Sequence, residues 1–65
     1  MHLILNGNTE ECACTTLAEL IDHKGLHKEA LIVELNGAII KQEQWPATTL
    51  QDGDQLELLN FVGGG

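Results

Sequence analysis

The C-terminal end of the chain is the clearest candidate for a reactive site, because it consists of the three glycines Gly63, Gly64 and Gly65. Glycine has no Cβ and the largest backbone entropy of any residue, so we expect residues 63–65 to form a flexible tail. Such a tail is slim enough to pass through a narrow channel and present its carboxylate to a partner's catalytic site. Three extended residues reach about 10 Å, which is enough to enter such a pocket. The alternative is a frayed terminus without a function. Against it, the glycines directly follow the apolar Phe61 and Val62 without a polar spacer.

The two thiols offer a weaker candidate site. Cys12 and Cys14 are separated by one residue, and no second cysteine pair stands at the spacing of a zinc site. A sulfur-transfer thiol needs a positive charge or a helix N-terminus nearby, and the neighbouring Glu10 and Glu11 oppose such activation. The sequence therefore favours structural, buried or half-buried thiols.

The histidines do not complete a catalytic or metal site. His23 and His27 stand four residues apart, but Gly25 lies between them and is expected to end the helix that would align them. Neither these residues nor His2 has an acid and a nucleophile at a recognisable spacing, so a catalytic triad is not supported. We expect no bound metal and no cofactor on this chain.

Length and charge narrow the possible partners. The chain has 65 residues, with 3 Lys and Arg against 10 Asp and Glu, a net charge of -7 and 43% hydrophobic residues. A chain of this length forms one domain with a thin core. The scarcity of basic residues excludes nucleic acid and disfavours an anionic membrane, whereas a protein with a basic face is the natural electrostatic partner. Neither a membrane span nor a signal-peptide core is present, so a cytoplasmic location is expected.

Turn signals divide the chain into strands and one helix. Asn6-Gly7 and Asn36-Gly37 are typical of tight hairpins. Asp52-Gly53-Asp54 marks a further turn, and Lys41–Leu50 is expected to be a polar connection in which Trp45 anchors the loop against the sheet edge. The expected strands are 1–5, 9–14, 31–35, 38–40 and 55–62.

The helix is expected to begin after Thr16, where Thr16 and Glu19 fit a capping box. Leu17, Leu20 and Ile21 then form a single apolar stripe, which one sheet face can cover. The sequence therefore predicts an α+β domain over residues 1–62, in which one main helix packs on a mixed sheet of four to five strands.

Strand alternation also predicts an apolar patch on the opposite face of this sheet. If the polar residues of each strand mark the solvent side, then Ile4, Ile32, Leu59 and Phe61 are exposed on it. Several apolar side chains on neighbouring strands beside a functional tail indicate a surface for a partner. We extend the expected partner-binding set through the following residues, Val62, Gly63 and Gly64.

Motifs along almost the whole chain resemble a known family. A hairpin, a helix and further strands that end in protruding glycines are similar to the ubiquitin-like β-grasp proteins, and more closely to the ThiS family of sulfur carriers in thiamine thiazole biosynthesis. The matching stretches are Leu35-Asn36-Gly37, Ile39-Ile40, Trp45, Leu50-Gln51-Asp52-Gly53-Asp54 and Phe61-Val62-Gly63-Gly64-Gly65. Each stretch alone is weak evidence for the family, whereas the complete set in this order is strong evidence.

The resemblance implies that this chain is a protein substrate and not an enzyme. A carboxylate is a poor electrophile, so a ubiquitin-activator-like adenylating enzyme of the ThiF type would first join Gly65 to AMP, with ATP and Mg²⁺ as its own cofactors. A sulfur donor protein that carries a persulfide would then convert Gly65 to a thiocarboxylate. Thiazole synthase of the ThiG type would take the sulfur, as enzymes do from other group carriers.

The sequence motifs are also compatible with other functions. A sulfur carrier for molybdopterin or amino-acid biosynthesis shares the Gly-Gly end, and a ubiquitin-like modifier that becomes conjugated to lysines does so too. A plain interaction module with an inert tail is a third alternative. The short chain and its Phe61–Gly65 ending favour the thiamine type.

Overall fold

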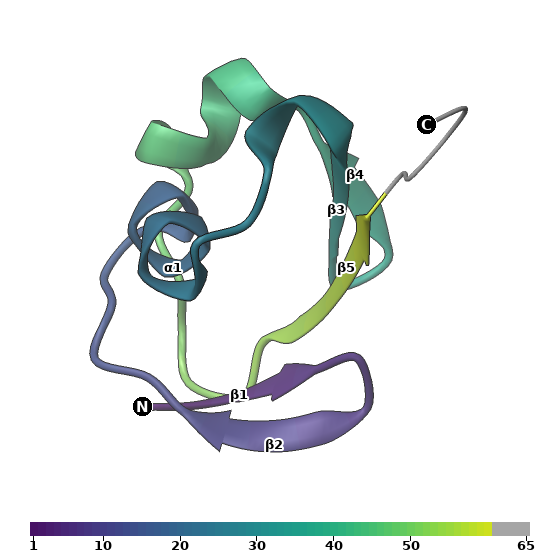
Figure 1. The fold of residues 1–65 in the computed structure, drawn as a ribbon. Helices are drawn as coiled ribbons and strands as arrows, with labels where there is room; N and C mark the ends of the chain where they lie inside the picture. The colour runs from purple at the N-terminus through teal and green to yellow at the C-terminus, as the bar shows by residue number, and fades with distance from the viewer. Residues whose placement is uncertain (61–65) are drawn as a thin grey trace.

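The computed structural model describes residues 1–60; the expectations for residues 61–65, including a domain boundary at 62, lie outside this part of the chain. The elements follow in the order β1 (His2–Leu5), β2 (Asn8–Glu11), α1 (Leu17–Lys24), η1 (Lys28–Ala30), β3 (Leu31–Leu35), β4 (Ala38–Ile40), η2 (Gln42–Ala47) and β5 (Gln55–Asn60). One main helix packs on one sheet, as Figure 1 shows, so the predicted α+β class is confirmed.

The sheet is mixed and has five strands in the order β2-β1-β5-β3-β4. Strands β1 and β5 run parallel, whereas the pairs β1–β2, β3–β4 and β3–β5 are antiparallel. The last strand therefore lies in the centre of the sheet, between two hairpins (Figure 1). Residues 61–65 follow the end of this central strand in the sequence.

Both hairpins turn through an Asn-Gly pair, as the sequence predicts. Asn6 and Asn36 have φ values of 48° and 51°, and the glycines that follow them have 85° and 88°. Two consecutive positive φ values make the turn twist in the same sense as the strands. Asn tolerates this region because its side chain can form local hydrogen bonds, and Gly tolerates it because it has no Cβ.

The helix begins and ends where the sequence predicts. The Thr16 hydroxyl accepts from the Glu19 amide at 3.3 Å, and the Glu19 carboxylate accepts from the Thr16 amide at 3.2 Å, which completes the capping box. Gly25 adopts φ 67° at the C-terminal end, and its amide donates to the Asp22 carbonyl.

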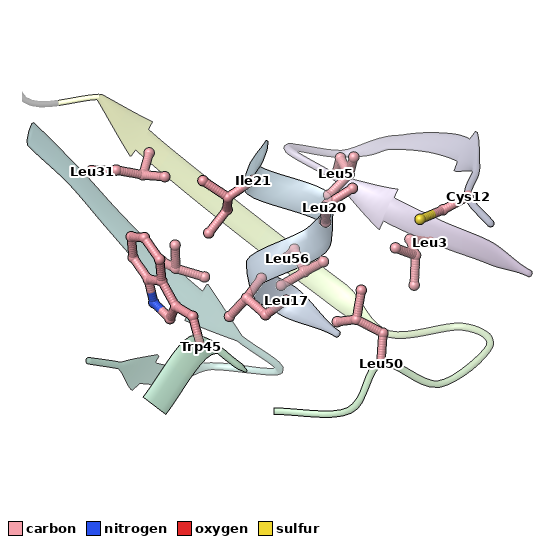
Figure 2. Packing of buried hydrophobic residues seen from close by; sticks show 11 residues of the cluster. Leu3, Leu5, Cys12, Leu17, Leu20, Ile21, Leu31, Trp45, Leu50 and Leu56 are labelled. Atoms are coloured by element: carbon pink, nitrogen blue, oxygen red, sulfur yellow. The ribbon is translucent and has the colours of Figure 1, made fainter. Parts of the chain in front are cut away.

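The core lies between α1 and the sheet. Leu17, Leu20 and Ile21 of α1 point toward the strands, where Leu3, Leu5, Leu31 and Leu56 face them (Figure 2). Val33 of β3 belongs to the same buried cluster. The predicted apolar stripe of the helix is thus fully buried. All of the inward strand positions are two residues apart, which is the strand period.

Trp45 anchors the loop to the edge strand β4, as predicted, but its ring is buried more deeply than an anchor at the edge requires. Its side chain is 3% exposed and belongs to the core, where its Nε1 donates to the Ile40 carbonyl at 3.0 Å. The polar connection around it folds into η2 beside α1, which closes the end of the core (Figure 2). In a chain with a single Trp and no Tyr, this ring supplies a large share of the buried volume.

Candidate functional site

The sheet face opposite α1 carries the predicted partner-binding residues that the structure describes. Leu59 is 50% exposed, and Ile4 and Ile32 are half-buried. The inward neighbours Leu3 and Leu56 are buried, so the predicted assignment of the two faces is confirmed for these strands. A single exposed Leu is common on protein surfaces. Whether Leu59 forms part of an apolar patch therefore depends on its neighbours.

The strand register brings some of these residues together and leaves one apart. Ile32 and Leu59 are directly paired across β3 and β5. Ile4 is paired with Gln55, four positions before Leu59 on the same strand, which corresponds to about 13 Å. Ile4 therefore lies at the opposite end of β5 from the Ile32–Leu59 pair.

Ile39 belongs to this face but was missed in the sequence. It is 66% exposed, more than any other large apolar residue that the structure describes. It belongs to the edge strand β4 and is paired with Glu34 of β3. The alternation of Ile39 with the half-buried Ile40 after the Asn36-Gly37 turn is the signal that could have identified it.

Two carboxylates interrupt the apolar residues. Glu34 and Glu57 are directly opposite each other in the β3–β5 pairing, between the Gln55 and Leu59 levels of β5. Like charges in this position repel each other and destabilise the strand pair. The outward face therefore combines exposed aliphatic groups with concentrated negative charge, which suits an apolar partner surface that carries basic residues.

The remaining predicted site residues follow β5 in the sequence. Phe61, Val62 and the glycines at 63, 64 and 65 lie outside the described residues. Asn60 is the last residue of β5, and it is still paired with Leu31 of β3. The described strand thus carries Leu59 on the outward face, and residues 61–65 follow it in the sequence.

The two thiols lie on the other side of the molecule, in a cleft of about 460 Å³ between β2 and α1. Cys12 is buried in the core, and its Sγ accepts from the Cys14 amide at 3.1 Å. Burial raises the pKa of the Cys14 thiol; Cys12 and Glu19 raise it further, and Lys24 opposes them. An activated thiol requires the opposite shift, so the environment supports the structural interpretation.

The histidines are exposed and separate. Gly25 ends α1 between His23 and His27, as predicted, and His27 lies at the start of η1. His2 is 3.2 Å from Glu11 on the edge of the sheet. Among residues 1–60, no three His, Cys, Asp or Glu side chains are grouped so that they could hold a metal ion. The same residues include no helix long and apolar enough to cross a membrane.

Known proteins are similar to this chain in sequence and in fold. The model of the ThiS family matches residues 3–65. The sulfur carrier protein ThiS of Escherichia coli is 30% identical over the full length of both chains. A crystal structure of the thiamine biosynthesis protein ThiS from Geobacter metallireducens is 36% identical, covers both chains completely and superimposes with a TM-score of 0.84. This likeness confirms the β-grasp fold that the resemblance implied.

Two longer relatives contain a segment that is similar to this chain. The thiazole synthase of Magnetococcus marinus is 38% identical over the whole of this chain, which spans 20% of that protein's length. The thiazole synthase of Paramagnetospirillum magneticum is 32% identical, and the chain again spans 20% of it. Family model, full-length relative and solved structure all agree with the motifs in the sequence, and the chain belongs to the ThiS family of sulfur carriers.

Proposed function

We propose that this chain is a sulfur carrier of thiamine biosynthesis, and that the carboxylate of Gly65 is the group that carries the sulfur. The observation that supports it best is the family match over residues 3–65, because the match includes the terminal glycines as well as the folded part. The end-to-end alignment with the Escherichia coli sulfur carrier protein supports the same role. The carriers of this family are small sulfur carriers and not catalysts.

The chemistry at Gly65 needs two partners. An adenylating enzyme transfers AMP from ATP to the carboxylate and releases pyrophosphate, with Mg²⁺ and ATP bound by that enzyme. The outer sulfur of a donor persulfide then attacks the acyl carbon and displaces AMP. A further thiol cleaves the resulting acyl disulfide, which leaves a thiocarboxylate on Gly65 and a disulfide between the two thiols. Each step uses the carrier only as a substrate, which is why it needs no cofactor of its own. Since this chemistry depends on ATP, we expect the carrier to act in the cytoplasm.

Thiazole synthase is the proposed acceptor of the sulfur. Two thiazole synthases contain a segment that matches this entire chain, so carrier and synthase occur there within one polypeptide. Segments joined in one protein often work together when they are separate chains. This observation favours the thiamine pathway over molybdopterin or amino-acid biosynthesis and over a protein modifier.

The outward sheet face is the proposed docking surface for the adenylating enzyme. Leu59 and Ile32 supply adjacent apolar side chains near the end of β5, and Ile39 extends the exposed apolar area on β4. The carboxylates of Glu34 and Glu57 lie beside them and favour basic groups on the partner. Docking here places the partner next to the strand that leads into residues 61–65.

Intact mass spectrometry tests the proposed function directly. The chain is incubated with the adenylating enzyme, ATP, Mg²⁺ and a persulfide donor, and a product in which one oxygen is replaced by sulfur is expected. Omission of ATP is the matched control and must abolish the product. A chain that stays unmodified, or that becomes linked to lysines of other proteins, contradicts the sulfur-carrier role.

A further inference from the structure

The Asn6 side chain continues the sheet where β1 stops. Backbone bonds join β1 to β5 from the Ile4 amide to the Asp54 carbonyl and from the Asn6 amide to the Leu56 carbonyl, each at 2.9 Å. The positive φ of Asn6 then turns the backbone away toward β2. At the next step the Asn6 carboxamide replaces the backbone: its Oδ1 accepts from the Leu58 amide at 2.8 Å, and its Nδ2 donates to the Leu58 carbonyl at 3.3 Å.

The contact between Asn6 and Leu58 lies near the C-terminal end of β5, which residues 61–65 follow. A carboxamide has one acceptor and a donor group like a peptide unit, so one side chain can satisfy both backbone groups of Leu58. On the opposite side, β3 pairs with β5 up to Asn60. Leu58 is therefore held on the β1 side by Asn6, while β3 pairs with β5 on the other side. Leu58 directly precedes Leu59 and is two residues from the end of the described strand.

Asn36 provides an internal comparison. It has nearly the same φ and the same following glycine, and its carboxamide also binds β5. Its Oδ1 accepts from the Gln55 amide at 3.0 Å and its Nδ2 donates to Asp54 at 3.1 Å. The two asparagines thus perform similar local chemistry at opposite ends of β5, and only Asn6 acts at the end that leads to the glycines.

We propose that Asn6 is a positioning residue for the activation of Gly65. This inference rests on the proposed function. By holding Leu58 in the sheet, Asn6 fixes the point from which the C-terminal segment starts. Without it, the last hydrogen-bonded point on the β1 side moves back to Leu56, and β5 is held less firmly near its C-terminal end. A reacting group that is displaced by about 1 Å can lose about 100-fold in rate.

The test compares Asn6→Gly with Asn36→Gly, since glycine accepts the positive φ and removes two side-chain hydrogen bonds in each case. Pyrophosphate release by the adenylating enzyme is measured over a range of carrier concentrations well below the Tm of every variant. We expect kcat to fall by about tenfold or more for Asn6→Gly, with a KM close to wild type, and to stay near wild type for Asn36→Gly. Hydrogen exchange at Leu58 is expected to accelerate about tenfold in Asn6→Gly alone, as the loss of two ordinary hydrogen bonds implies.

The outcomes separate this inference from the proposed function. Equal kcat values for the two glycine variants overturn the role of Asn6, because a general loss of stability affects both in the same way. Absence of pyrophosphate release with the wild-type chain overturns the proposed function instead. If Asn6→Gly does not fold, Asn6→Asp replaces it, since aspartate keeps the acceptor for the Leu58 amide and loses the donor. Wild-type kcat for Asn6→Asp then contradicts the proposal, and a reduced kcat supports it.

Discussion

Ile32 and Leu59 are directly opposite each other on β3 and β5, on the sheet face that α1 leaves uncovered. Both branched side chains belong to the outward positions of their strands, whereas their neighbours Val33 and Leu58 point toward the core side. The pair lies at the end of the central strand, next to the segment with the proposed reactive carboxylate. Exposed apolar contacts at such a position are well placed to orient a partner.

Replacement of Leu59 by Asp is expected to weaken binding to the adenylating enzyme by about 2 kcal/mol or more, as for central interface residues. The new charge is unfavourable at an apolar contact and adds to the repulsion of Glu57. Because Leu59 is half exposed, the free energy of unfolding is expected to change by less than about 1 kcal/mol. Titration calorimetry measures the affinity, and a urea titration measures the stability.

Gln42→Asp is the matched control, because it adds the same charge at an exposed position of η2, away from the outward face. Its affinity is expected to equal that of the wild type. If the folded Leu59→Asp variant also binds the adenylating enzyme with wild-type affinity, docking does not occur through the Ile32–Leu59 pair.

Removal of the helix cap tests the local stability of α1. Thr16→Ala deletes the oxygen that accepts from the Glu19 amide, and we expect a loss of about 1 kcal/mol in the free energy of unfolding. Thr16→Ser keeps that oxygen and is expected to stay within about 0.5 kcal/mol of the wild type. Equal stability of the Ala and Ser variants in urea unfolding means that the capping bond makes no net contribution.

The local elements could be predicted because each has a short-range physical cause. The Asn-Gly turns need two positive φ values, the Thr16–Glu19 pair caps the helix, and Gly25 ends it. These requirements act within a few residues, so the sequence displays them directly. The assignment of strand faces follows in the same way from the period of two.

The order of the strands and the deep burial of Trp45 could not be predicted from such local causes. The central place of β5 depends on its pairing with β1, about 50 residues away, and periodicity does not contain this information. Trp45 stands in a polar stretch that has no apolar period, and only the three-dimensional path of η2 brings it into the core. The separation of Ile4 from Leu59 on the outward face is likewise a consequence of register.

The thiols are expected to be dispensable for sulfur loading. A variant with both Cys12→Ala and Cys14→Ala is expected to form the thiocarboxylate at the wild-type rate, because neither thiol lies on the outward face or near β5's end. Loss of the buried Cys12 sulfur is expected to lower the free energy of unfolding by about 1 kcal/mol. Mass spectrometry after incubation with the partner enzymes measures the loading. A folded double variant that no longer accepts sulfur contradicts the structural interpretation.

The raised pKa of Cys14 also predicts the pH dependence of its reactivity. The ordinary value is 9.0, and burial raises it in the folded state, so less thiolate is present at pH 8 than in an unfolded chain. Alkylation by iodoacetamide is therefore expected to be slower than for a free cysteine peptide. The protonated thiol therefore makes a favourable contribution to stability that is complete below pH 9 and is lost as the pH rises through the folded-state pKa. Alkylation of the Cys12→Ala variant at or above the peptide's rate contradicts this environment.

Shortening the glycine segment tests the central chemistry. Deletion of Gly65 reduces the reach of the chain by about 3.5 Å, which is more than a reacting geometry tolerates. Gly64→Val keeps the length but adds a branched side chain where a narrow channel is expected to admit only backbone. Both changes lie beyond β5, so circular-dichroism melts are expected to match the wild type. Neither variant is expected to support pyrophosphate release with ATP and the adenylating enzyme, whereas a substitution at the exposed Gln42 leaves release unchanged. Normal turnover of the Gly65 deletion contradicts the carrier mechanism, because that mechanism uses no other group of this chain.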